Sequence, residues 1–237
     1  MALQLGFGGS LQLRGNDRES LRQAITLSID TYREYARAIA PRPDDSRAVF
    51  WRLAFSIMSV HSPIGATFEA YSAVRRFHAV FGRLPGRERL ISLLRTPGND
   101  GVVQYGPTKA GYLKELERTW KLDKAALLRG PDSDHEWRLR IQRQVKGLGM
   151  AKASFAVALC RPNRADVCCI DTHMHQLLTG SVPRKGNIGK RRYLELEGRI
   201  RELAQEHQVS TFAMQWLLWD AQRGIREPHK ALRDRSV

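Results

Sequence analysis

The four residues KGLG, at 146–149, constrain the fold more than any other part of the chain. They join two segments with a helical pattern, PDSDHEWRLRIQRQV (131–145) and MAKASFAVALC (150–160). Glycine takes positive φ at little cost and lets another backbone approach closely. Gly147 and Gly149 therefore predict a tight hairpin between two helices. Free amides at the start of the second helix can cradle a phosphate, and Lys146 adds positive charge beside them. Taken alone, a Gly-x-Gly between helices is weak support for this function, since most such pairs are simple turns.

The rest of the chain also has a helical pattern almost throughout. Leu21, Ile25, Ile29 and Tyr32 recur at helical spacing. Residues 46–60 are apolar nearly all round, which predicts a buried central helix. Ser133 lies three positions before Glu136, the spacing of a capping box. A short strand is conceivable only for VCCI at 167–170, and no segment pairs with it in an obvious way. We expect an all-α fold.

The charge balance indicates a polyanionic partner. The 237 residues include 39 Lys and Arg but only 24 Asp and Glu, a formal net charge of +15. Nucleic acid fits such an excess better than a membrane surface does. The plainer alternative is a basic protein whose charge serves only solubility.

Other classes of protein fit the sequence less well. No apolar run approaches the ~20 residues that a membrane-spanning helix needs. The start, MALQLGFGGSLQLRGN, lacks the pattern of a signal peptide. The three cysteines, of which Cys168 and Cys169 are adjacent, are typical of reduced cytosolic thiols. We expect a cytoplasmic monomer with no membrane contact, no metal and no cofactor.

Asp171 has both an ordinary and a functional interpretation. An Asp before a helix is an N-cap, and that alone accounts for it in most proteins. Backbone amides and the helix dipole also hold a capping carboxylate ionised. Such a group can stabilise a sugar cation or activate a nucleophile.

The hairpin and Asp171 together carry a resemblance to a known superfamily. VKGLGMAKASFAVALC followed by CCIDTHM resembles the helix–hairpin–helix, loop and Asp signature of the HhH-GPD DNA glycosylases, which include endonuclease III and 8-oxoguanine glycosylase. FSIMSVHSPIGAT (55–67), YGPTKAGYLKEL (105–116) and FAMQWLLWDAQRG (212–224) are similar to further segments of the family, in the same order.

The resemblance implies two helical lobes with a cleft between them. One lobe would span 47–164 and contain the hairpin at 146–149; the other would combine 1–46 with 165–237. The target nucleotide of double-stranded DNA would be flipped into the cleft, which costs a few kcal/mol. Asp171 would lie at the mouth of the cleft.

Other residues gain expected roles from the same comparison. His61, where the family often has Gln or Asn, would fill the gap left in the duplex; a helix-end histidine packed on Pro63 is the alternative. Tyr105 would stack on a base, although a core position is the more common fate of such a residue. We expect the DNA contacts to come from Lys146, Gly147, Gly149, Lys152, His61, Ser62 and, in the basic loop PRKGNIGKRR (183–192), Lys185 and Lys190. We expect the base or leaving-group pocket to include Tyr105, Lys109 and His173.

The sequence departs from the family at the nucleophile. In bifunctional glycosylases a Lys stands two residues after the second hairpin Gly and forms a Schiff base. Ala151 occupies that place here, and Lys152 is one residue later, rotated by about 100° around the helix. Lys152 is therefore either a phosphate-facing lysine or, if the hairpin is shifted by one residue, the catalytic amine.

Three functions follow from the loss of this lysine and the presence of Asp171. The first is a monofunctional glycosylase, in which Asp171 supports the sugar cation and positions water. The second is a transferase of the phage type, in which a free amino acid displaces pyrophosphate from an activated 5-hydroxymethyluracil in DNA. Lys109, Lys152 or Arg161 would then hold the pyrophosphate. The third is a DNA-binding module without catalysis.

Overall fold

The computed structural model describes residues 3–5, 9–11, 18–42, 45–97, 101–183 and 188–222. Within these ranges the chain is helical apart from one small antiparallel hairpin, β1 (Leu3–Leu5) and β2 (Gly9–Leu11). The all-α class is therefore confirmed. Residues 167–170 form an extended segment rather than a strand.

The described residues divide into two compact units. The first contains the residues up to Ala40 and those from Arg161 onward, and the second contains Pro41–Cys160. The helices of the first unit are α1 (Arg18–Ile39), α8 (Thr172–Thr179), α9 (Lys190–Glu206) and α10 (Thr211–Gln222). Those of the second are α2 (Ser46–Met58), α3 (Ile64–Phe81), α4 (Arg87–Arg95), α5 (Gly106–Leu122), the 3-10 turn η1 (Lys124–Leu127), α6 (Asp134–Gln144) and α7 (Met150–Cys160).

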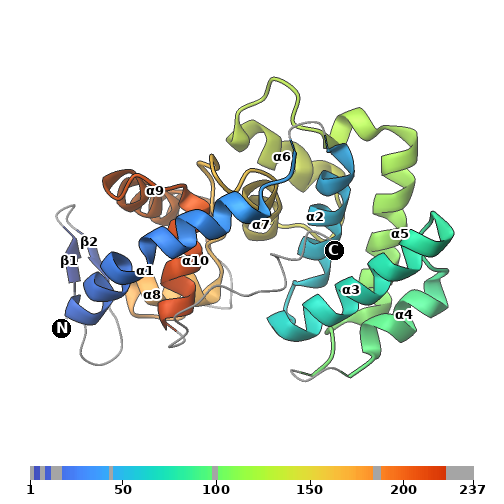
Figure 1. Ribbon diagram of the computed structural model, residues 1–237, viewed down its shortest axis with the longest axis horizontal. Helices are drawn as coiled ribbons and strands as arrows, with labels where there is room; N and C mark the ends of the chain where they lie inside the picture. Colours follow the sequence, from blue (N-terminus) through green and yellow to red (C-terminus); the bar gives the residue numbers. More distant parts are fainter. Residues whose placement is uncertain are drawn as a thin grey trace. The chain divides into compact units, whose positions relative to one another are not determined.

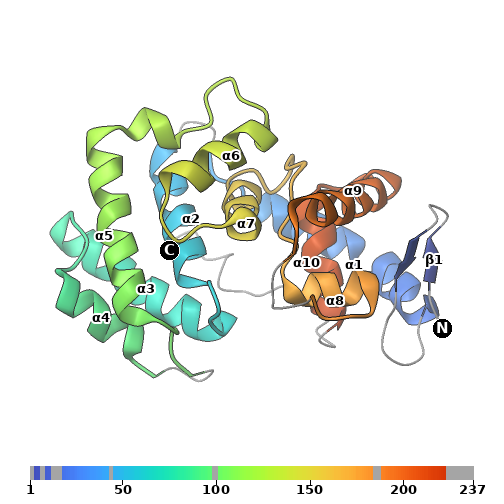
Figure 2. The same cartoon turned by 180° about the vertical axis from the view of Figure 1, so that it is seen from behind.

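The core of the first unit lies between α1 and α10, which cross and pack against each other (Figure 1). Tyr35 of α1 stacks on Phe212 with ring centroids 6.4 Å apart and meets the edge of Trp216. Beside them, the buried hydroxyl of Tyr32 donates to Asp220 at 2.7 Å. Helices α8 and α9 both pack against α10 (Figure 2). The helix that carries Asp171 at its start therefore rests on a rigid aromatic core.

The core of the second unit is built on α2. Eight of its residues are buried, including Leu53, Phe55 and Ile57. Helices α3, α5 and α7 pack around α2. This confirms the buried central helix predicted from its all-round apolar pattern, because a helix without a polar face has to be covered on every side.

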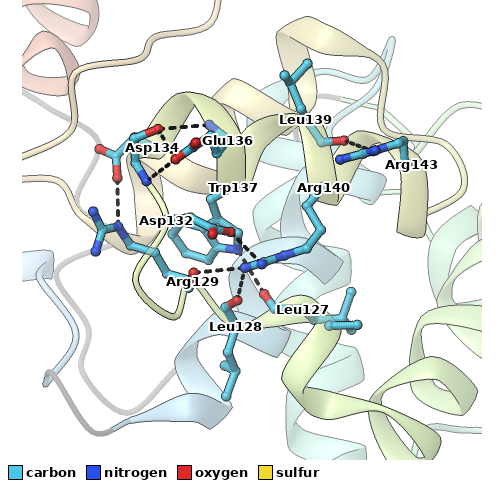
Figure 3. A network of polar contacts seen from close by, with 12 residues as sticks. Leu127, Leu128, Arg129, Asp132, Asp134, Glu136, Trp137, Leu139, Arg140 and Arg143 are labelled. Carbon is cyan, nitrogen blue, oxygen red and sulfur yellow. Dashed lines mark hydrogen bonds and ion pairs between the residues drawn. The ribbon is translucent and has the colours of Figure 1, made fainter.

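A polar network fixes the first helix of the hairpin (Figure 3). The indole of Trp137 donates to the carbonyl of Leu127 at 3.0 Å. Arg140 donates to the carbonyls of Leu128 and Arg129. At the start of α6, Ser133 and Glu136 form the predicted capping box. The preceding turn is thus bound to α6 by hydrogen bonds that a shift of the helix would break.

The two hairpin helices are joined by a buried hydrogen bond. Arg138 of α6 donates from Nη1 to Ser154 Oγ of α7 at 3.2 Å, and both residues are at most 2% exposed. Leu148, in the turn, is only 3% exposed. The hairpin is therefore anchored by its interior residues, which leaves its outer residues available for contact with a ligand.

None of the described helices is long and apolar enough to cross a membrane.

Candidate functional site

The hairpin turn depends on Gly147. Its φ is +86°, and an added Cβ would lie 2.4 Å from Cδ2 of Tyr112 on α5. Both conditions exclude a side chain at this position. After the turn, α7 begins at Met150. The carbonyl of Gly149, just before it, accepts a hydrogen bond from the amide of Ala153 at 2.9 Å.

Gly149 and Lys146 form the open side of the hairpin. Gly149 is exposed, has no positive φ, and would place a Cβ in empty space. Neither the backbone conformation nor the packing therefore requires a glycine at this position, and no side chain of residue 149 covers the start of α7. Lys146 lies at the surface and pairs with Glu115 of α5 at 3.2 Å. An anion approaching the turn would meet both.

Lys109 is buried and binds the end of α2 and the loop after it. Its Nζ donates to the carbonyl of Met58 at 2.8 Å, to the carbonyl of Val60, and to Ser62 Oγ at 2.7 Å. The same Ser62 oxygen accepts the amide of Gln104 at 2.9 Å. Lys109 is 3% exposed, and this burial, with the positive charge of Lys152 as a second cause, lowers the pKa of Lys109 to about 8. The amine expected in a pocket is thus engaged by protein oxygens.

His61 and Tyr105 are brought together by this arrangement. Their rings lie 6.2 Å apart in an edge-on geometry. Both have positive φ, +50° and +57°, although neither is glycine. Such strain persists only where surrounding contacts impose it, and it is common at functional sites. Tyr105 is 65% exposed and His61 is also exposed, so the pair forms an aromatic projection at the surface.

Lys152 points toward the interior side of α7. Its Nζ lies 5.1 Å above the ring of Phe155, which itself packs on Phe55 of α2. Its charge also acts on Lys109. The structure thus associates Lys152 with the α2 side of the unit. Ala151, beside it, is half-buried.

Asp171 lies in the first unit at the end of the extended segment 167–170. Three backbone amides of that segment are held by side chains: Cys168 by Glu197, Cys169 by Gln215 and Ile170 by Tyr193. Asp171 then caps α8, with Oδ1 accepting the amide of Met174 at 2.9 Å. Within the described ranges, Oδ2 has no hydrogen-bond partner. Among the described residues, the carboxylate is therefore held through one of its two oxygens.

The other predicted site residues are His173, Lys190 and Lys185. His173 is exposed on α8, whereas His175 is buried with Nδ1 2.8 Å from the carbonyl of Ser181. Lys190 is exposed at the start of α9. Lys185 lies outside the described residues. Cys160, Cys168 and Cys169 are buried free thiols, and the described side chains contain no cluster of three metal-binding groups.

Comparison with known proteins assigns the family. The model of the 8-oxoguanine DNA glycosylase family, Ogg-HhH, matches residues 30–209, which is most of the chain. The chain belongs to the 8-oxoguanine DNA glycosylase family. It is therefore a DNA-binding enzyme of the glycosylase superfamily, as the hairpin and Asp171 predicted.

Solved structures agree on the fold. The 8-oxoguanine DNA glycosylase of Methanocaldococcus jannaschii is 19% identical, with a TM-score of 0.61 over 87% of this chain and 89% of that one. The glycosylase/lyase of the same organism, in complex with a 15mer DNA containing 8-oxoguanine, is 20% identical, with a TM-score of 0.61 over 86% and 91%. The 8-oxoguanine DNA glycosylase of Thermotoga maritima is 18% identical, with a TM-score of 0.59 over 89% and 94%.

Sequence reasoning did not find the network around Ser62. Its members, Met58, Val60, Gln104 and Lys109, come from segments more than forty residues apart. The available signal was the combination of a lysine on an otherwise apolar helix face with a loop of small polar residues. That combination does not predict which oxygens the lysine contacts, because a buried amine can donate to many different carbonyls.

The hairpin glycines are predicted to tolerate alanine very differently. Gly147→Ala should lower the free energy of unfolding by about 1–3 kcal/mol, because it combines positive φ with a collision against Tyr112. Gly149→Ala, the matched control, should unfold like the wild type, since its Cβ meets no atom. Denaturant melts of the two variants measure this. Equal stability of both would refute the turn geometry.

Lys109 is predicted to give a pH dependence of stability of defined sign. Its pKa is about 8 when folded and 10.5 ordinarily, so between these values the unfolded chain binds more protons. The free energy of unfolding should therefore rise with pH across this window, and not below pH 8. Lys109→Met, which has no amine to titrate, is the reference at each pH. If the free energy of unfolding of the wild type minus that of the variant stays constant or falls across this pH window, the burial of a charged amine is contradicted.

Proposed function

We propose that this enzyme excises 8-oxoguanine from double-stranded DNA by hydrolysis, without forming a Schiff base. The observation that carries the proposal is Asp171, whose capped carboxylate keeps one oxygen available. The substrate follows from the family and from the relatives that act on 8-oxoguanine.

The chemistry requires an anion beside the sugar. Departure of the base breaks the bond between C1′ and the base nitrogen and leaves an oxocarbenium-like sugar. The free Oδ2 of Asp171 would stabilise that cation and orient the water that adds to C1′. Asp171 suits the role because the hydrogen bond from the Met174 amide fixes its carboxylate at the start of α8.

The second unit would hold the DNA. The exposed start of α7 at Gly149, with Lys146 beside it, would bind a backbone phosphate. His61 and Tyr105 would occupy the space that a flipped nucleotide leaves in the duplex. Lys109 would keep them in place through Met58, Val60 and Ser62, and would thus be a positioning residue.

Three features favour hydrolysis over the other chemistries considered. Ala151 has no amine where lyases of the superfamily carry their nucleophile. Of the three basic residues that could hold pyrophosphate in a transferase, Lys109 already has three protein acceptors. The family match likewise favours base excision over amino acid transfer.

Asp171→Asn is predicted to separate capping from catalysis. Asn caps a helix about as well as Asp, so thermal stability should stay close to that of the wild type. Single-turnover excision of 8-oxoguanine, measured by alkaline cleavage of the abasic strand, should fall about a hundredfold or more. A folded Asp171→Asn enzyme with full excision rate would reduce Asp171 to a helix cap and sink the proposal.

Borohydride trapping is predicted to distinguish hydrolysis from lyase chemistry. The wild-type enzyme should give no covalent adduct with 8-oxoguanine DNA, because no amine stands at position 151. Ala151→Lys places an amine where the superfamily has its nucleophile, and should form an adduct that borohydride makes permanent. This variant is the positive control. An adduct of the wild type that disappears in Lys152→Arg would instead identify Lys152 as a nucleophile.

A further inference from the structure

The first unit contains a cavity lined by arginines. It has a volume of about 630 Å³ and lies between the later turns of α1, the loop 163–166 and the turn that joins α9 to α10. Arg33, Arg37, Arg164 and Arg201 line it, and Asp166 is the one carboxylate in the lining. Asp171 and the hairpin are not part of its wall.

Two of the arginines are fixed by the protein. Arg33 pairs with Asp30 and donates from Nη2 to the carbonyl of His207 at 3.2 Å. Arg201 donates from Nε to the carbonyl of Asp166 at 3.1 Å, and its Nη2 lies 3.8 Å from Glu197. These contacts hold both guanidinium groups at the wall of the cavity.

The other two arginines are available to a ligand. Arg37 and Arg164 are exposed, and the side chain of neither has a hydrogen bond or an ion pair with any of the described residues. Both are brought to a wall that already has two positive charges. Such a concentration of like charge favours an anion in the cavity.

A phosphate group is the anion that best fits this lining. The planar guanidinium donates two parallel hydrogen bonds to phosphate oxygens, and a group of arginines can surround one or two phosphates. The cavity lies within the ~300–1,000 Å³ that small-molecule sites usually have, larger than one inorganic phosphate needs. The side chains of Asn163, Gln205 and Gln208 in the same wall can bind further polar groups.

We propose that this arginine-lined cavity is a second phosphate-binding site, separate from the hairpin, and that it takes a ligand the size of a nucleotide. The phosphate has two possible sources, a free phosphorylated molecule or the backbone of DNA. Both sources would be recognised by the same guanidinium–phosphate hydrogen bonds. They differ in that only the first predicts saturable binding of a small phosphorylated molecule.

The test compares two double variants of equal charge. Arg37→Gln/Arg164→Gln removes the two available arginines and leaves the contacts of Arg33 and Arg201 described above in place. Arg83→Gln/Arg89→Gln, from exposed positions of the second unit, removes the same charge elsewhere. Both would be titrated by calorimetry, at one fixed salt concentration, with inorganic pyrophosphate, with deoxyguanosine 5′-monophosphate and with a short undamaged duplex. Thermal melts would establish that both variants are folded.

The expected result is saturable binding of the two small probes to the wild type and to the Arg83/Arg89 variant. The Arg37/Arg164 variant should bind them about tenfold more weakly or worse, as the loss of charge-assisted hydrogen bonds predicts. If only the duplex distinguishes the two variants, the phosphate comes from the DNA backbone and the site still stands. If all three probes bind both variants equally, the proposal is overturned. Excision activity is a separate measurement, because Asp171 and the hairpin, on which the proposed function rests, are not part of this cavity.

Discussion

The buried ammonium of Lys109 is the interaction on which the geometry of the second unit depends. Removing a charged amine from water costs several kcal/mol unless all of its N–H groups donate hydrogen bonds. Here Met58, Val60 and Ser62 accept these hydrogen bonds, which hold the end of α2 and the following loop against α5. His61, whose φ is positive, lies between two of these acceptors, Val60 and Ser62.

Helix α5 extends the same constraint to the hairpin. Tyr105 immediately precedes the helix, and Lys109, Tyr112 and Glu115 follow within its first three turns. Tyr112 packs where Gly147 has no side chain, and Glu115 pairs with Lys146. One helix thereby sets the spacing between the aromatic projection and the hairpin turn.

Asp171 is positioned by a different device in the first unit. The segment 167–170 passes through the interior without strand partners, which would leave buried amides unsatisfied. Glu197, Gln215 and Tyr193 accept those amides. Because these three side chains come from α9 and α10, the carboxylate is tied to the aromatic core rather than to a loose loop.

The sequence predicts best what short-range rules decide. The capping box at Ser133, the N-cap at Asp171, the buried α2 and the hairpin turn all depend on residues a few positions apart, and the structure has each of them. Contacts between distant segments were beyond such rules. The partners of Lys109 lie about fifty residues away, the positive φ of His61 and Tyr105 has no glycine to mark it, and the convergence of Arg37 with Arg164 appears only after folding. The two hairpin glycines look alike in the sequence, yet only Gly147 needs to be glycine for the conformation of the turn.

Mass analysis of reaction products tests the central claim most directly. The enzyme would be incubated with a duplex containing one 8-oxoguanine, with and without added amino acids. The masses of the released small molecules and of both strands would then be measured by mass spectrometry. Hydrolytic excision predicts free 8-oxoguanine and an uncleaved strand with an abasic site, whether or not amino acids are present. A nucleoside of increased mass with its glycosidic bond intact, formed only when an amino acid is added, would contradict the account.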